Sequence, residues 1–303
     1  VICLKEGTHA LPANVRVHSL GKERGARSGI AYALRFLSLA WRLRNEYDAV
    51  FVHMNQEYVV IAGWLWKLLR KRVSLWRNHY EGSLLTALAA ACSDTVFYTS
   101  AHSYTARFKN AVQMPVGVDL ERFSRGSGTV RAPRSILFVA RMAPSKRPEM
   151  LIDALALLPN EFTASFYGSA LPEHTEYYEG LKEKVRALGL TNRVSFHPSV
   201  PNDALPDIYR AHEIFVNTSP SGMLDKTIFE AAASGCLVLA ASEDFAESAG
   251  EAFAFSGSAE LAKRLQEILA LTEEGREAAR AMLGGLSARN SLTALASDLF
   301  DKI

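Results

Sequence analysis

Residues 214–240, IFVNTSPSGMLDKTIFEAAASGCLVLA, decide the fold of this chain. An apolar run opens the stretch, a polar loop follows, then comes a pattern typical of a helix, and a second apolar run closes it. Strand, loop, helix and strand in this order are the repeating unit of a parallel sheet. Asp225 suits the N-cap of the helix, and the amides of Lys226 and Thr227 would then open a helix whose positive end can hold phosphate.

The same alternation of apolar runs and helical patterns extends over the whole chain, which at 303 residues exceeds what one hydrophobic core organises. We therefore expect an α/β fold of two Rossmann-like, doubly wound domains that face a cleft. The expected strands are residues 1–5, 15–20, 49–53, 73–76, 95–99, 111–114, 135–140, 163–167, 193–196, 213–217 and 236–240. The expected helices are residues 30–44, 59–70, 83–91, 148–158, 176–188, 203–211, 225–234 and 259–269.

A polar segment without periodicity, SRGSGTVRAP at residues 124–133, predicts a linker between the two halves. The expected domains are residues 1–126 and residues 127–285, followed by a helix over residues 286–303 that packs back toward the first domain. Ligands of such sheets bind beyond the carboxyl ends of the strands. The loops that end the strands should therefore line the cleft.

The composition excludes several classes of function. With 34 Lys and Arg against 32 Asp and Glu, the formal net charge of +2 does not indicate a nucleic-acid partner. The three cysteines, Cys3, Cys92 and Cys236, match no metal-ligand spacing. The sequence lacks the dinucleotide, P-loop, zinc-protease and serine-hydrolase signatures and any Asp-x-Asp pair, so we expect neither a metal nor a cofactor. No run of about 18 apolar residues occurs, which favours a cytoplasmic protein.

Two cations leave the carboxyl end of one expected strand. In ILFVARMAPSK, residues 136–146, Arg141 ends the strand and Lys146 follows five residues later. A guanidinium and an ammonium at this place can neutralise a diphosphate without a metal ion. A pair of solvated surface cations is the alternative that the local sequence leaves open.

Glu230 lies one turn into the helix expected from Asp225. Its carboxylate would face the same edge of the cleft and suit paired sugar hydroxyls. A capped amphipathic helix with an exposed Glu explains the same pattern, so both interpretations stay open.

Polar residues also follow the expected strands of the first half. His79 comes after one strand and His53 ends another, and each imidazole either faces the cleft or makes a structural hydrogen bond. Asn55 and Gln56 open the next helix, where they either line a site or cap the helix. His53, Asn55 and Gln56 are candidates for the acceptor side of the cleft.

Three segments together resemble the family 4 retaining glycosyltransferases, the glycosyl transferases group 1 with the two-domain GT-B fold. They are PVGVDLERF at residues 115–123, the strand that leads to Arg141 and Lys146, and EAAASG at residues 230–235. The resemblance implies a hexosyl- or related transferase of the EC 2.4 class that moves a sugar from a nucleotide-diphosphate sugar with retention and without a metal. UDP or GDP is the implied nucleotide, and the implied acceptor is a glycan, a lipid or a small molecule.

The resemblance also assigns roles to single residues. Arg141 and Lys146 would bind the donor diphosphate, Glu230 the ribose, and His79 would approach the transferred sugar, so these four are the implied catalytic residues. Ser199 and Val200 stand in the loop that touches the base. The further implied donor contacts are Gly117, Gly222, Met223, Leu224, Asp225, Lys226 and Thr227.

Two features depart from the family pattern. Gly222 stands where the family has an acidic residue, eight positions before Glu230, so Asp225 or Lys226 is expected to take over some donor contacts. Val1 resembles the start of the family's second strand, which implies that a first strand and a glycine-rich loop, about 40 residues, are missing. A GT-B sugar-nucleotide epimerase and a sugar-nucleotide-binding relic without turnover therefore stay as alternatives.

Residues 63–72, GWLWKLLRKR, combine aromatic side chains with four cations. Helices that lie on a membrane surface have this composition, and so does a domain helix with a basic end. The sequence therefore leaves open a peripheral contact with the inner face of a membrane.

Overall fold

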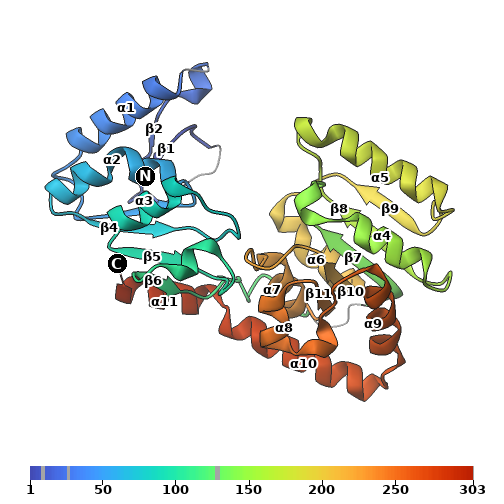
Figure 1. Ribbon diagram of the computed structural model, residues 1–303. Helices are drawn as coiled ribbons and strands as arrows, with labels where there is room; N and C mark the ends of the chain where they lie inside the picture. The colour runs from blue at the N-terminus through green and yellow to red at the C-terminus, as the bar shows by residue number, and fades with distance from the viewer. Residues whose placement is uncertain (8–10, 26–27, 127–129, 303) are drawn as a thin grey trace.

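Two parallel sheets form the framework of the protein (Figure 1). The computed structural model describes residues 1–7, 11–25, 28–126 and 130–302. The first sheet has the order β3-β4-β5-β6, with β3 Ala49–His53, β4 Arg72–Trp76, β5 Thr95–Tyr98 and β6 Ala111–Gln113. The second has the order β11-β10-β7-β8-β9, with β7 Ala132–Val139, β8 Thr163–Tyr167, β9 Val194–His197, β10 His212–Asn217 and β11 Leu237–Ala240. The expected α/β fold with parallel sheets is confirmed.

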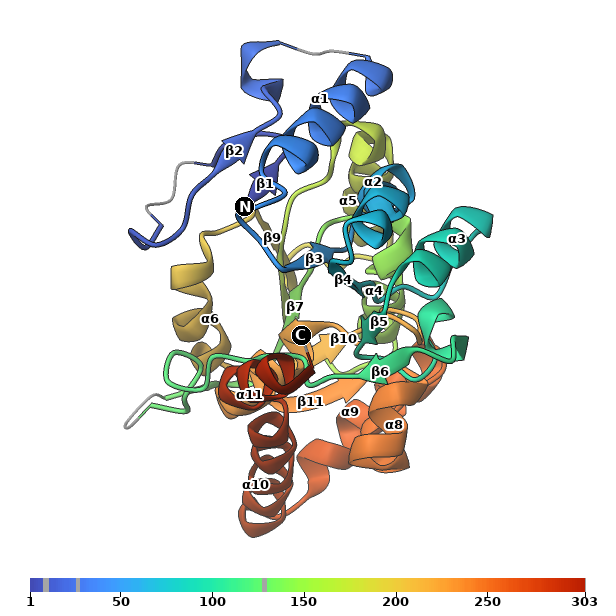
Figure 2. The ribbon, with the colours of Figure 1, turned by 90° about the vertical axis from the view of Figure 1, so that its left-hand side faces the viewer.

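Helices connect the strands and cover both sheets (Figures 1 and 2). They are α1 Gly29–Arg42, α2 Gln56–Leu68, α3 Leu84–Cys92, α4 Glu149–Ala156, α5 Thr175–Ala187, α6 Leu205–Ala211, α7 Lys226–Ala233, α8 Glu243–Ala249, α9 Ser258–Ala270, α10 Glu273–Arg289 and α11 Leu292–Lys302. The sequence did not predict α8 or the first part of α10. Within the described ranges, no helix has both the length and the apolar character that crossing a bilayer requires.

The second sheet is buried on both faces, which explains the continuous apolar runs of its strands. In β7, Ile136 and Phe138 belong to one core, and Leu137 between them belongs to the other. In β10, Ile214 and Phe215 divide between the two cores in the same way. Neighbouring side chains of a strand point to opposite faces, and so a strand with helices on each side needs an apolar residue at every position.

The C-terminal segment forms two helices, so the expectation of one helix starting at residue 286 is wrong. Helix α10 continues through that position to Arg289, and α11 begins at Leu292. The break lies at Asn290, whose side-chain Oδ1 accepts the Val116 amide at 3.1 Å. The Asn290 carbonyl accepts the amides of Gly117 and Val118 at 3.0 and 2.8 Å. These hydrogen bonds join the end of α10 to residues 116–118, which lead from the first sheet to the second. They take the place of further helical hydrogen bonds, and α10 ends here.

Helix α11 returns to the first sheet, where Figure 1 shows it beside β6. Leu295 and Leu299 pack against a cluster that contains Trp76, Phe97 and Met114. The chain thus passes between the two sheets twice, once at residues 116–118 and once at Asn290. The two passages lie side by side, and hydrogen bonds between them hold both in place.

A cavity of about 920 Å³ lies between β3 and a short two-stranded parallel sheet, β1 Ile2–Cys3 and β2 His18–Ser19. Both strands are shorter than residues 1–5 and 15–20, which the sequence predicted. His53 and Asn55 line this cavity. Gln56 is buried, and its Oε1 has no hydrogen-bond partner among the described residues.

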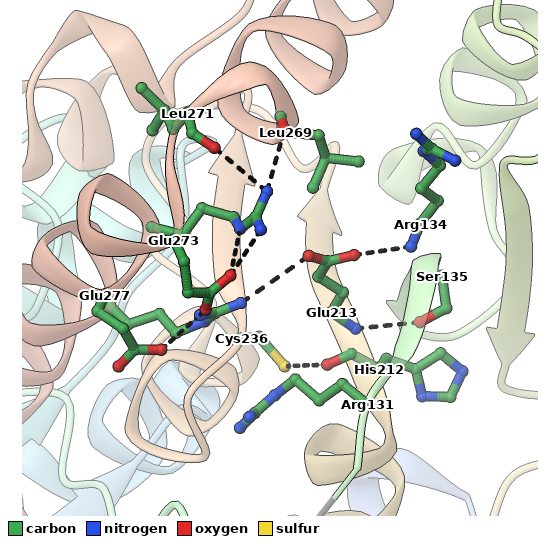
Figure 3. A network of polar contacts seen from close by, with 12 residues as sticks. Arg131, Arg134, Ser135, His212, Glu213, Cys236, Leu269, Leu271, Glu273 and Glu277 are labelled. Atoms are coloured by element: carbon green, nitrogen blue, oxygen red, sulfur yellow. Dashed lines mark hydrogen bonds and ion pairs between the residues drawn. The ribbon is translucent and has the colours of Figure 1, made fainter.

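An ion-pair network around the buried Arg280 joins α10 to the second sheet (Figure 3). Arg280 contacts Glu277 at 2.6 Å and Glu213 of β10 at 3.9 Å. Arg125 donates two hydrogen bonds to Glu277, and these bonds are the main reason why the pKa of Glu277 falls to about 2. Burial raises the pKa of the nearby Cys236 thiol to about 12. Arg125 belongs to the expected linker at residues 124–133, of which 127–129 lie outside the described residues, and β7 already includes its last two positions.

Substitution of Gly117 tests the paired crossing. Gly117 has φ +82°, and an added Cβ would lie 2.4 Å from Leu295 Cδ2. We expect Gly117→Ala to lower the thermal unfolding midpoint, with a cost of about 1–3 kcal/mol from strain and overpacking. Gly285→Ala is the matched control, because Gly285 lies inside α10 with nothing within 4 Å of its Cβ position and should gain about 0.5–1 kcal/mol. A Gly117→Ala protein that melts at or above the wild-type temperature would contradict this account.

Candidate functional site

A cavity of about 200 Å³ opens at the carboxyl ends of β7, β8 and β9, next to the start of α7. Four residues that the sequence singled out line it together: Arg141, Ser199, Val200 and Thr227. The other lining residues are Val139, Ala140, Tyr167, Gly168 and Leu205. Parallel strands end at the same edge of their sheet, and this is why positions so far apart in the chain meet here.

Two groups in this pocket are free to bind a ligand. Arg141 is exposed and makes no hydrogen bond or ion pair with the described residues. The hydroxyl of Thr227, the second residue of α7, is buried and likewise has no partner in the described part of the chain. A buried hydroxyl without a hydrogen-bond partner destabilises the folded protein unless a ligand or a water molecule bonds to it.

Lys146 is held differently from Arg141. Its Nζ lies 2.6 and 2.7 Å from the two carboxylate oxygens of Asp225 and 3.1 Å from Ser219 Oγ. Asn217 donates to the same carboxylate at 3.0 Å, and Ser219 donates to it as well. Burial acts to raise the pKa of Asp225, but the charge of Lys146 and these hydrogen bonds outweigh it and hold the pKa below its ordinary value. The two cations that the sequence grouped together therefore have different charge environments.

Asp225 occupies the N-cap position of α7, as expected, but its side chain does not cap the helix. The carboxylate turns toward Lys146 instead. The amides at the start of α7 are thus not used by this side chain, in a helix whose N-terminus favours anions.

Glu230 is buried, with 4% of its surface exposed, so the interpretation as an exposed residue on a capped helix is wrong. Tyr209 donates a hydrogen bond to Glu230 at 3.4 Å, and Lys226 lies 3.9 Å away. Burial raises the pKa of Glu230, and the charge of Lys226 offsets this only in part. Glu230 does not line the 200 Å³ pocket. Gly117 also lies elsewhere, at the crossing near α11.

The loop after β4 reaches across to the loop before α7. Asn78 Nδ2 donates to the Met223 carbonyl at 2.8 Å, while Asn78 Oδ1 accepts the amides of Thr99 and Ser100. The next residue, His79, accepts the Glu81 amide on Nδ1 at 3.0 Å. In the neutral ring this leaves Nε2 as the donor.

A side chain at position 222 would not fit, because loops of the first sheet occupy the space beside Gly222. It has φ +87°, and an added Cβ would lie 2.6 Å from Tyr80 Cβ and 2.9 Å from the His102 carbonyl oxygen. The Gly222 amide donates to the buried Asp244 at 3.0 Å, and Ser100 Oγ donates to both oxygens of the same carboxylate. An acidic side chain at position 222 would clash here. Sequence reasoning missed Asn78 and Asp244, since nothing local marks either as a contact between distant segments.

Beside this contact, His102 joins the first sheet's loop to α8. Its Nε2 lies 3.1 Å from Glu247 and its Nδ1 lies 3.4 Å from Glu243. Burial acts against the charged ring, but the hydrogen bond to Glu247 and the charges of Asp244, Glu247 and Glu243 outweigh it and raise the pKa of His102.

Two parallel sheets covered by helices, with a pocket at the strand ends of the second, place the protein in the class of α/β folds with two Rossmann-like sheets. Residues 133–271 match the family model described as Glycosyl transferases group 1.

Two curated relatives each match less than half of the chain. Mannosylfructose-phosphate synthase of Agrobacterium fabrum is 31% identical over 147 residues, which are 44% of this chain and 32% of that protein. A D-inositol 3-phosphate glycosyltransferase of Mycolicibacterium gilvum is 33% identical over 138 residues, which are 41% of this chain and 30% of that protein. The matched part thus spans about a third of the length of these relatives.

Solved structures match nearly the whole chain. HepE (Alr3699) of Anabaena, in complex with UDP, has a TM-score of 0.79 at 19% identity over 94% of this chain and 85% of that one. Sucrose-phosphate synthase of Thermosynechococcus elongatus has a TM-score of 0.68 at 18% identity over 90% of this chain and 79% of that one. The fold is that of the GT-B glycosyltransferases, as expected.

The histidine contact predicts a pH-dependent stability. The raised pKa means that the charged ring stabilises the folded protein. This contribution is full below the ordinary pKa of histidine and disappears as the pH rises through the raised value. We expect His102→Gln to lower the melting temperature at about pH 5.5 and to have little effect at about pH 8.5.

Thermal melts of both proteins over this pH range measure the difference. The control is His174→Gln, because the His174 side chain makes no hydrogen bond or ion pair with the described residues. A constant difference between His102→Gln and wild type at all pH values would contradict the ion-pair account.

Proposed function

We propose that this protein transfers a sugar, with retention of configuration, from a UDP- or GDP-linked donor to a glycan, lipid or small-molecule acceptor. The observation that carries the proposal is the pocket that joins Arg141, Ser199, Val200 and Thr227 at the strand ends of the second sheet. Its place within residues 133–271, which match the Glycosyl transferases group 1 model, supports the same function.

The donor diphosphate would lie between Arg141 and the start of α7. Arg141 lines the pocket and pairs with no carboxylate among the described residues, and the Thr227 hydroxyl has no hydrogen-bond partner among them. Lys146 would add charge from the side, in competition with Asp225. The base would lie near Ser199 and Val200. UDP is the first candidate, because solved structures of HepE hold UDP and UDP-glucose.

The chemistry rests on the leaving group. As the bond to the sugar breaks, negative charge develops on the diphosphate, and Arg141, Lys146 and the amides at the start of α7 would stabilise it. We propose that no metal takes part. His79 would orient the sugar or the acceptor, and closure of the two domains would exclude water that hydrolyses the donor. The cytoplasmic location stays a prediction.

Two other functions remain open. A sugar-nucleotide epimerase would need an acid and base pair at the sugar, and a relic would bind the nucleotide without turnover. Transfer of the sugar to an acceptor separates the transferase from both.

Removal of the free guanidinium tests the pocket. We expect Arg141→Ala to weaken UDP binding by roughly tenfold or more, since hydrogen bonds to charged groups contribute about 1.5–3 kcal/mol. Isothermal titration calorimetry measures the affinity. Arg186→Ala is the control, because Arg186 is an exposed arginine of α5 with only a surface pair to Glu183. Unchanged affinity for UDP and GDP in Arg141→Ala would refute the donor site.

Metal removal tests the proposed mechanism. We expect EDTA to leave the release of UDP from UDP-sugars unchanged, because protein cations would stabilise the leaving group. Assays with and without added Mg²⁺ or Mn²⁺ measure the release rate. Activity that is lost in EDTA and restored by either ion would contradict a metal-free reaction.

A further inference from the structure

Large apolar side chains are exposed on the outer face of the helices that cover the first sheet. Between 47% and 76% of the surface of each remains accessible. Helix α1 contributes Ile30, Leu34 and Trp41; α2 contributes Trp64 and Leu68; and α3 contributes Leu84, Leu85 and Leu88. We call these eight residues the apolar face. Exposed apolar side chains scattered singly are ordinary, but a group of this size on one layer marks an interaction surface.

The spacing places the exposed residues of each helix in one stripe. Ile30, Leu34 and Trp41 are four and seven residues apart, and Trp64 and Leu68 are four apart. The opposite sides of these helices are also apolar, since Phe36 and Trp66 are buried in the core of the first sheet. A helix with apolar side chains on both sides is not built to face water on one of them.

The three stripes are neighbours. Helix α2 packs against both α1 and α3, and Figure 2 shows the three helices in succession along one side of the molecule. Gly63 permits a close approach, because an added Cβ would lie 2.8 Å from Cys92 Cβ of α3. The apolar face therefore extends over three helices that are neighbours in space.

Cations outnumber acids in the helices α1 to α3 and the residues that directly follow them. Residues 29–48, 56–72 and 84–92 contain seven Lys and Arg against the acids Glu46, Asp48 and Glu57, and Lys71 lies 3.7 Å from Asp48. The cations are Arg35, Arg42, Arg44, Lys67, Arg70, Lys71 and Arg72. The Arg44 guanidinium lies 4.5 Å from the ring centre of Trp41. Charge complementarity thus requires an occupant that is apolar inside and anionic at its surface.

We infer that the apolar face docks on a lipid bilayer with anionic headgroups. The aliphatic side chains enter the acyl boundary, the two tryptophans lie at the level of the headgroups, and the cations meet the anionic lipid. A second copy of the chain is a poorer occupant, because two such faces would place like charges opposite each other. The surface lies outside the donor pocket, so this inference stands apart from the proposed transferase activity.

Docking would place the cleft near the membrane. Helix α3 starts at Leu84, directly after the loop that carries His79. A lipid or lipid-linked acceptor in the bilayer would then reach the loops of the first sheet without crossing the rest of the domain.

Vesicle sedimentation with the 303-residue protein tests the inference. We expect binding to vesicles of phosphatidylcholine with phosphatidylglycerol, and a blue shift of the tryptophan emission on binding. The triple variant Leu34→Ser, Trp64→Ser, Leu84→Ser should bind at least about tenfold more weakly, because each change removes an inserted apolar side chain. Leu157→Ser, Leu188→Ser, Leu271→Ser is the matched control, since these leucines are exposed in the second half of the chain.

A second variant separates charge from apolar contact. Arg42→Gln, Arg70→Gln, Arg72→Gln removes cations whose side chains make no hydrogen bond or ion pair with the described residues. We expect roughly tenfold weaker binding to anionic vesicles, and no change with phosphatidylcholine alone.

Three results would overturn the inference: no binding to anionic vesicles, equal loss in the control variant, or a dimer in light scattering that the apolar-face variant abolishes. Calorimetry with UDP on the same samples keeps this outcome distinct from a failure of the donor site.

Discussion

Burial of the second sheet on both faces requires helices on each side, and these crossovers return every strand in the same direction. The carboxyl ends of β7, β8 and β9 therefore meet at one edge, and their loops enclose the pocket with the start of α7. The alternation of Ile136, Leu137 and Phe138 between the two cores fixes this arrangement. The donor site that we propose follows from the packing of the sheet before any polar residue is considered.

At this edge of the sheet, Lys146 and Arg141 differ in whether a carboxylate neutralises their charge. Asp225 holds Lys146 through a carboxylate that also accepts hydrogen bonds from Asn217 and Ser219, while Arg141 makes no ion pair with the described residues. A cation paired in this way is fixed in position but contributes less net charge to an incoming anion. The Arg141 guanidinium is thus the stronger candidate to bind the diphosphate. The Lys146–Asp225 pair holds both of its side chains in fixed positions beside the site.

The loop at Gly222 connects the two halves of the protein. Its backbone packs against Tyr80 and His102, and Asp244 receives hydrogen bonds from Gly222 and Ser100. Close contact explains why a glycine stands where the resembled family has an acid. The glycine permits a tight junction between the halves, and Asn78 adds a second bond at the same place.

The order of strands and helices could be predicted from the sequence, because buried parallel strands and amphipathic helices leave different apolar periods in the chain. Arg141 and Thr227 could be placed at this edge because one ends a strand and the other opens a helix, whereas Ser199 and Val200 came from the family resemblance; the structure brings all four into one pocket. The break at Asn290, the burial of Glu230 and the pairing of Lys146 with Asp225 did not follow. Each of these depends on partners far away in the chain, and local sequence carries no signal for a contact made only when the two sheets and their crossings come together.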